Sequence, residues 1–168
     1  MSKTLTKQGR LVAPVDRVLA LLTDPAFVRR RHLAQGAVAV TVVERERTAG
    51  RLVQAAELTE FARTRTGGVD RTRTEPATTT YTWDLVTRRC TWQYLGPQRG
   101  YIRLGGSMRL EPAGDETTLH AGFEVEVSVP LIGRVIEGVV LKEIDAFEPT
   151  YLALVREGLQ AKGTADAP

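Results

Sequence analysis

The sequence contains a single cysteine and only two histidines in 168 residues. One cysteine excludes an intramolecular disulfide framework and agrees with a reducing compartment. Because histidine and cysteine are so scarce, no spacing typical of a metal site occurs, and we expect neither a metal nor another cofactor. Cys90 falls on the apolar side of an alternating segment, which predicts a small buried hydrophobic side chain.

Long apolar runs are also missing. None approaches the roughly 20 residues that a membrane-spanning helix needs, and residues 1–8 lack the apolar core of a signal peptide. We therefore expect a cytoplasmic protein. Two halves of this chain would each be too short to bury a sufficient core. The sequence thus predicts a single domain over residues 1–160, followed by a disordered tail over 161–168 that has nothing to pack.

Basic residues slightly outnumber acidic ones, 23 to 20, and they gather in the triplet Arg29-Arg30-Arg31 and in the segment 63–73. A nucleic-acid-binding surface usually combines a basic face with aromatic side chains for stacking. The aromatic residues here lie in other segments, so we expect a solvated arginine-rich surface and no nucleic-acid partner. If the two clusters lie near a cavity mouth, they would contact an acidic head group or an anionic membrane surface at the periphery.

Hydrophobic periodicity gives the order of the elements. Residues 4–11 alternate and stop before Pro14, which predicts a first strand. Apolar residues at helical spacing predict a short helix from Val15, and Asp24 as N-cap with Pro25 at the first helical position predicts a second over 26–33. A period of two then predicts six strands, at residues 37–47, 51–61, 78–86, 89–95, 101–110 and 117–129.

After Pro130 the period returns to 3.6. An apolar stripe from Ile132 to Val155 predicts a helix of about 28 residues, from 132 to about 159. Pro149 lies inside it and should remove one backbone hydrogen bond and bend the helix. The segment 63–76 places two arginine–threonine arms around a pair of glycines. It can form a polar hairpin or a mobile loop, and we expect it at the surface, over or near an opening.

This order of elements resembles the START-like (SRPBCC) superfamily. The opening, Ala13-Pro14-Val15 and then Thr23-Asp24-Pro25, is similar to that family, and Val129-Pro130-Leu131-Ile132-Gly133 resembles a bacterial branch of unknown function. The resemblance covers nearly the whole chain. It implies an α+β, helix-grip fold, with a seven-stranded curved antiparallel sheet around the long C-terminal helix and two short helices after strand 1. The superfamily includes lipid carriers, plant allergens, polyketide cyclases and ring-hydroxylase domains, so this fold selects no single function.

A strongly bent sheet cannot lie flat against a straight helix. The gap is either filled by side chains or left as an apolar cavity that accepts apolar ligands. Strand alternation and the helical wheel place one set of residues on the two facing surfaces. We predict these as ligand-binding residues: Tyr81, Trp83, Trp92, Tyr94, Met108, Phe123, Glu143, Phe147 and Tyr151. The alternative is that they pack as ordinary core.

Few side chains are candidates for catalysis. His32 follows the arginine triplet and is expected to be exposed, while His120 lies on the polar side of its strand; a general base must instead face its substrate. Glu143 falls within the apolar stripe of the last helix. It would face the cavity with a raised pKa, pair with an inward arginine such as Arg103, or reach solvent at the mouth. The catalytic candidates are therefore Glu143 and Tyr94.

Three functions fit these observations. The first is a non-catalytic binder or carrier of a hydrophobic small molecule, such as a lipid, sterol, quinone or polyketide-like aromatic. The second is an enzyme of the polyketide cyclase/dehydratase kind, with polar cavity groups supplied by Glu143, Tyr94, Arg103 and Tyr151. The third is an interaction domain whose cavity is vestigial and filled. We favour the first, and so expect a protein that is not an enzyme.

Overall fold

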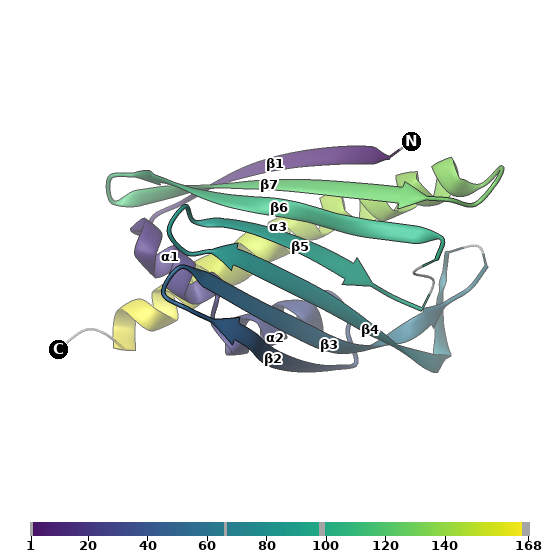
Figure 1. Cartoon of the computed structure of the whole chain (residues 1–168), viewed down its shortest axis with the longest axis horizontal. Helices are drawn as coiled ribbons and strands as arrows, with labels where there is room; N and C mark the ends of the chain where they lie inside the picture. The colour runs from purple at the N-terminus through teal and green to yellow at the C-terminus, as the bar shows by residue number, and fades with distance from the viewer. Residues whose placement is uncertain (1, 66, 98–99, 166–168) are drawn as a thin grey trace.

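The computed structural model describes residues 2–65, 67–97 and 100–165, in which seven strands form one antiparallel sheet around a long C-terminal helix (Figure 1). The strand order is β1-β7-β6-β5-β4-β3-β2. This confirms the α+β, helix-grip architecture expected from the sequence. The elements are β1 (Lys3–Leu11), α1 (Val15–Leu22), α2 (Pro25–Ala34), β2 (Ala39–Arg47), β3 (Arg51–Arg63), β4 (Val69–Asp84), β5 (Arg89–Leu95), β6 (Ile102–Ala113), β7 (Glu116–Val127) and α3 (Gly133–Ala165).

The two short helices begin where the sequence places them. The Asp24 carboxylate accepts a hydrogen bond from the backbone N–H of Ala26 at 2.9 Å, and Pro25 occupies the first position of α2. This is the expected N-cap, because the cap satisfies a backbone donor that the first helical turn leaves free. In α1 the apolar positions Val15 and Val18 are buried, so its amphipathic face lies against the core.

Helix α3 differs from the expected helix at both ends. It continues to Ala165, so residues 161–165 of the predicted disordered tail are helical, while 166–168 lie outside the described residues. Pro149 lies within this continuous helix. The predicted apolar stripe is not buried along its whole length, since Ile132, Val135 and Val139 are exposed. These first turns lie at the end of the sheet beside β7 (Figure 1). No described helix is both long and apolar enough to cross a membrane.

The arginine–threonine segment forms the polar hairpin. Strands β3 and β4 stay paired as far as Arg63 and Val69, beyond a register shift between Phe61 and Ala62. The Arg71 guanidinium lies 5.2 Å from the centre of the Phe61 ring, a cation–π contact that helps to order the two arms. Arg63 reaches from this hairpin to α3, where its two terminal nitrogens donate to Glu143, each at 3.1 Å. The hairpin is therefore joined to the C-terminal helix.

The interior divides into a closed half and a more open half. Near α1, the side chains of Leu11, Val18, Trp83 and Val155 are almost fully buried. Toward the other end of the sheet, strand register points a second group of apolar side chains to the same inner face, but these stay only partly buried. They are Leu5, Trp92, Tyr94, Leu104 and Phe123. The helical side chains Ile136, Val140, Ile144 and Phe147 of the first half of α3 are also only partly buried.

A glycine lets two aromatic rings of the open half meet. Trp92, Gly106 and Phe123 are neighbours across β5, β6 and β7, and the two rings make an edge-to-face contact at 5.8 Å between centroids. A Cβ at Gly106 would lie 2.0 Å from the Gly122 carbonyl oxygen and 2.9 Å from the indole of Trp92. No side chain fits there without moving backbone, so this position requires glycine.

We expect Gly106→Ala to lower the free energy of unfolding by about 1–3 kcal/mol, the usual cost of overpacking a core. Urea unfolding would measure this as a lower midpoint at an unchanged m-value. Gly138→Ala is a matched control, because a Cβ there meets its nearest atom at 3.7 Å. Alanine in place of a helical glycine should stabilise by up to about 1 kcal/mol. Equal midpoints for the two variants would contradict the close approach at Gly106.

Candidate functional site

Helix α2 places two basic side chains inside the protein: Arg31, which is charged, and His32, which is neutral. His32 is only 5% exposed, and its Nε2 lies 2.8 Å from the Tyr81 hydroxyl. Arg31 Nη1 donates to the same hydroxyl at 2.7 Å. The Arg31 guanidinium carbon lies 5.4 Å from the Tyr81 ring centre and 5.2 Å from that of Tyr151 on α3. These four residues, Arg31, His32, Tyr81 and Tyr151, form what we call the Arg31 cluster.

The expectations for α2 were wrong at two of its four basic positions. Arg29 and Arg30 are exposed, as expected, but His32 is buried and Arg31 points inward. The signal was available in the spacing: Arg31 lies four residues after Phe27, and His32 four residues after Val28. Side chains four apart share a helix face, and both Phe27 and Val28 are buried.

Burial sets the protonation states of the cluster. Burial, and then the charge of Arg31, lowers the pKa of His32 to about 3, so this imidazole is neutral at pH 7. Burial raises the pKa of Tyr81 to about 12 and that of the nearby Cys90 thiol to about 12. In a neutral imidazole one ring nitrogen donates and the other accepts, and Nε2 of His32 shares its hydrogen bond with the Tyr81 hydroxyl at 2.8 Å. The one charge of the cluster is therefore that of Arg31, whose guanidinium stays protonated.

Arg31 has no acidic partner. No carboxylate of the described residues lies within 4.0 Å of it, and its Nε is buried with no hydrogen-bond partner in the described part of the chain. An unpaired buried ion costs several kcal/mol. Each aromatic face offsets about 1–2 kcal/mol of this cost through a cation–π contact. The positive charge is thus held by two tyrosine rings and one hydroxyl instead of by an acid.

A second polar pair lies nearer the hairpin. The Tyr94 hydroxyl donates to Glu60 Oε2 at 2.6 Å. Burial, and then this bond to Glu60, raises the pKa of Tyr94 well above its usual range. Tyr94 is consequently a hydrogen-bond donor at neutral pH and cannot act as a base. Beyond it, the bond between Arg63 and Glu143 joins the hairpin to α3 at the surface.

The structure corrects one of the three options for Glu143. Its carboxylate is half exposed and bonded to Arg63, so it reaches solvent. The expected inward arginine, Arg103, has a side chain 79% exposed and lies 3.7 Å from Glu126 on the outer face of the sheet. Of the three options, the structure therefore agrees with the one in which Glu143 reaches solvent, and not with the pair to Arg103. His120 bonds Glu111 at 2.9 Å on that outer face, as its strand position indicated.

The remaining predicted ligand-binding residues fall into two groups. Tyr81, Trp83 and Met108 are buried in the core, and Trp83 is only 1% exposed. Tyr151 is partly buried, and its hydroxyl makes one weak contact, to the Met108 sulfur at 3.9 Å. The residues that border the more open half are Trp92, Tyr94, Phe123, Phe147 and Tyr151.

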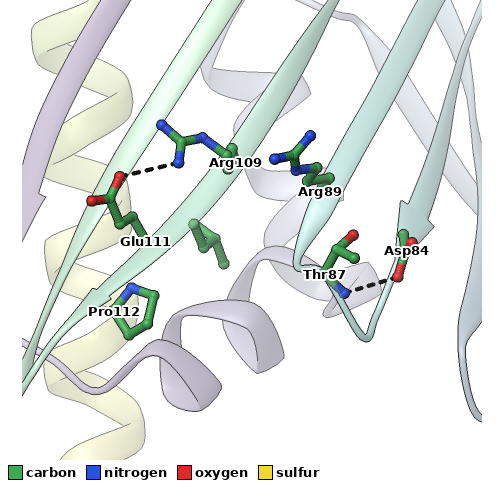
Figure 2. A pocket seen from close by; sticks show the side chains of 7 residues that line it. Asp84, Thr87, Arg89, Arg109, Glu111 and Pro112 are labelled. Atoms are coloured by element: carbon green, nitrogen blue, oxygen red, sulfur yellow. Dashed lines mark hydrogen bonds and ion pairs between the residues drawn. The ribbon is translucent and has the colours of Figure 1, made fainter.

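Surface depressions occur elsewhere, at the end of the sheet near the β4–β5 turn. One of about 410 Å³ is lined by Asp84, Thr87, Arg89, Arg109, Leu110, Glu111 and Pro112. Figure 2 shows three of its four charged side chains engaged: Arg109 pairs with Glu111 at 3.1 Å, and Asp84 accepts the Thr87 N–H at 2.9 Å. A neighbouring depression of about 290 Å³ lies over Arg51 and Arg89. No residue of the Arg31 cluster lines either one.

Metal chemistry finds no support in the described residues, in which no group of three or more histidine, cysteine or acidic side chains is placed to hold an ion.

Comparison with known families identifies the chain's relatives. The family model described as "Protein of unknown function (DUF2505)" matches residues 7–150, which is most of the sequence. The chain belongs to the DUF2505 family. No curated protein matches this DUF2505 sequence at a significant level.

Solved structures share the DUF2505 fold over nearly the whole chain. The protein TTHA0849 from Thermus thermophilus is 17% identical with a TM-score of 0.64, covering 98% of this chain and 100% of that one. The Zhui aromatase/cyclase from a Streptomyces species is 14% identical with a TM-score of 0.58, and the match covers 96% of this chain and 93% of that one. Norcoclaurine synthase from Thalictrum flavum, in complex with dopamine and hydroxybenzaldehyde, is 11% identical with a TM-score of 0.63. The match covers 100% of this chain and 90% of that one. These likenesses confirm the START-like fold.

Proposed function

We propose that this protein binds a hydrophobic small molecule between the sheet and the first half of α3. The observation that carries the proposal is the incomplete burial of side chains that point inward. Trp92, Leu104 and Phe123 share the inner face with Leu110 and Leu119, yet only the latter two are buried. Apolar side chains that stay accessible beneath a helix are typical of the lining of a ligand site.

The relatives support the same class of ligand. One fold neighbour is an aromatase/cyclase, and the norcoclaurine synthase was solved with dopamine and hydroxybenzaldehyde, which are small aromatic molecules. The aromatic lining of the open half, with Trp92 and Phe123 in edge contact, suits an apolar or aromatic guest. A lipid, sterol, quinone or polyketide-like aromatic remains the proposed ligand class.

The protonation states favour binding over proton transfer. An efficient general base has a pKa near the working pH. Two interior groups fall outside that range, because burial lowers the pKa of His32 to about 3 and raises that of Tyr94 well above its usual value. At pH 7 the hydroxyls of Tyr94 and Tyr81 are protonated and already hydrogen-bonded, to Glu60 and His32 respectively. We therefore propose a binder or carrier ahead of a cyclase.

A neutral fluorescent probe tests the proposal. We expect N-phenyl-1-naphthylamine to bind one site per chain, with increased probe emission on titration. Leu104→Trp would fill the space beside Tyr94, its neighbour across β5 and β6, and should weaken binding about tenfold or more, as expected when lining contacts are lost. Gln93→Trp adds the same ring to the exposed outer face and should leave the affinity unchanged. Absence of saturable binding to the wild-type protein would refute the proposal.

A further inference from the structure

The Arg31 cluster lies directly beside the open half of the interior. Tyr81 is the neighbour of Trp92 across β4 and β5. Tyr151 follows Phe147 by four residues on α3, so the two share a helix face. The guanidinium of Arg31 lies against the rings of Tyr81 and Tyr151. A guest resting on Trp92 and Phe147 would therefore have one end next to Arg31.

We propose that Arg31 binds the acidic head group of this guest, so that the ligand is an organic anion, a carboxylate attached to an apolar body. This inference rests on the proposed function, because it places the head of the ligand that the open half would hold. It narrows the ligand class from hydrophobic molecules in general to amphiphilic acids.

The hydrogen-bonding state of Arg31 carries the inference. Only Nη1 of its guanidinium has a partner among the described residues, the Tyr81 hydroxyl, while Nε is buried and unpaired. Arg31 as a whole residue is nevertheless only partly buried, so the cluster is not fully sealed. The two rings pack against the guanidinium, and its N–H edge is the part that binds a carboxylate in the bidentate manner.

Other arginines of the protein show the contrast. Arg63 pairs with Glu143 and Arg109 with Glu111. Each of these pairs lies at the surface, where water would solvate an unpaired arginine as well. Arg31 lies inside, where an unpaired charge is unfavourable, and has no acidic partner among the described residues. Among the residues that the structure describes, the Tyr151 hydroxyl contacts only the Met108 sulfur, at 3.9 Å, so it can become a second donor to the same head group.

Two matched probes test the role of Arg31. 8-Anilino-1-naphthalenesulfonate has the aromatic body of N-phenyl-1-naphthylamine plus one sulfonate, which here stands in for a carboxylate. We expect the full-length protein to bind the sulfonate about tenfold or more tightly than the neutral probe, since hydrogen bonds to a charged group strengthen binding by about that much. Arg31→Gln should remove this preference, so that the two probes bind with similar affinity.

Controls separate this inference from the proposed function. Arg29→Gln removes the same charge from an exposed position on the same helix and should keep the preference. Arg31→Lys, which keeps the charge, should retain part of it and serves if Arg31→Gln does not fold, as judged by near-ultraviolet circular dichroism. Equal binding of both probes to the wild type would overturn the role of Arg31 while leaving the proposed function intact. Failure of both probes to bind would overturn the two together.

Displacement of the bound sulfonate distinguishes two sources of carboxylate. Displacement by laurate indicates an acyl chain, and displacement by 2-naphthoate indicates an aromatic acid; either supports the inference. Their neutral counterparts, dodecanol and 2-naphthalenemethanol, should compete at least about tenfold less well. Equal competition by acid and alcohol would show that the head group is not recognised and would reject the carboxylate class.

Discussion

Replacing Tyr81 by phenylalanine should lower the free energy of unfolding by about 2–3 kcal/mol, toward the upper end of the cost of leaving buried groups unpaired. The Tyr81 hydroxyl is the shared partner of Arg31 Nη1 and His32 Nε2. Phenylalanine keeps the ring that lies against the guanidinium, but leaves both nitrogens without this partner. Urea unfolding at pH 7 would measure the difference, and the m-value should stay constant if only the native state is affected.

Tyr151→Phe is the matched control for this substitution. Tyr151 also lies against the Arg31 guanidinium, at 5.2 Å, but in the described part of the chain its hydroxyl contacts only the Met108 sulfur, at 3.9 Å. Removing that hydroxyl should cost less than about 1 kcal/mol, because a long contact to sulfur is weak. Equal losses for the two variants would mean that the bridging hydroxyl of Tyr81 has no special part in the cluster.

Acid should destabilise the protein through His32. The pKa of this side chain is about 3 in the folded state, against an ordinary value of 6.5. Between these values the unfolded chain binds more protons than the folded one, so the free energy of unfolding rises with pH and falls as the solution is acidified. From pH 6 to pH 4.5 we expect a loss of about 2 kcal/mol, since each pKa unit corresponds to about 1.4 kcal/mol.

His32→Gln isolates this contribution. Glutamine does not titrate, so the variant should lose less stability than the wild type between pH 6 and pH 4.5, by about the 2 kcal/mol attributed to His32. His120→Gln removes the other histidine of the sequence, which lies on the outer face of the sheet, and should keep the wild-type slope. Urea unfolding midpoints measured at a series of pH values would test this prediction. Parallel plots of midpoint against pH for the wild type and His32→Gln would argue against a buried neutral imidazole.

Hydrophobic periodicity predicted the fold because each strand and helix has one clearly apolar face. The alternation of residues 117–129 and the N-cap at Asp24 both correspond to what the structure contains. Periodicity overstated the burial of α3, where Val135 is 66% exposed. A helical wheel shows which residues share a face, but it does not show where the sheet ends. The sequence does not decide between a hairpin and a loop at 63–76, because the pairing depends on backbone register, which polar arms do not reveal.

The site was harder to predict than the fold. The aromatic lining follows from strand alternation, so Trp92 and Tyr94 could be placed on the inner face. Arg31 and His32 were missed because a run of basic residues is ordinarily solvated, and this prior outweighed their spacing from Phe27 and Val28. The charge of the site depends on whether an acidic side chain lies beside Arg31 in the folded chain. The order of residues in the sequence does not show this. Contact of the arginine-rich surfaces with an anionic membrane stays a prediction.

The division of the interior has an evolutionary consequence. Around Trp83 and Val155 almost no surface remains accessible, so changes there alter stability, commonly by several kcal/mol for a large truncation. Around Leu104 and Phe123 the packing is incomplete, so changes of size or shape are tolerated more readily. One half of the molecule can therefore change in sequence while the other keeps the chain folded, which suits a fold that similar structures share at less than one-fifth sequence identity.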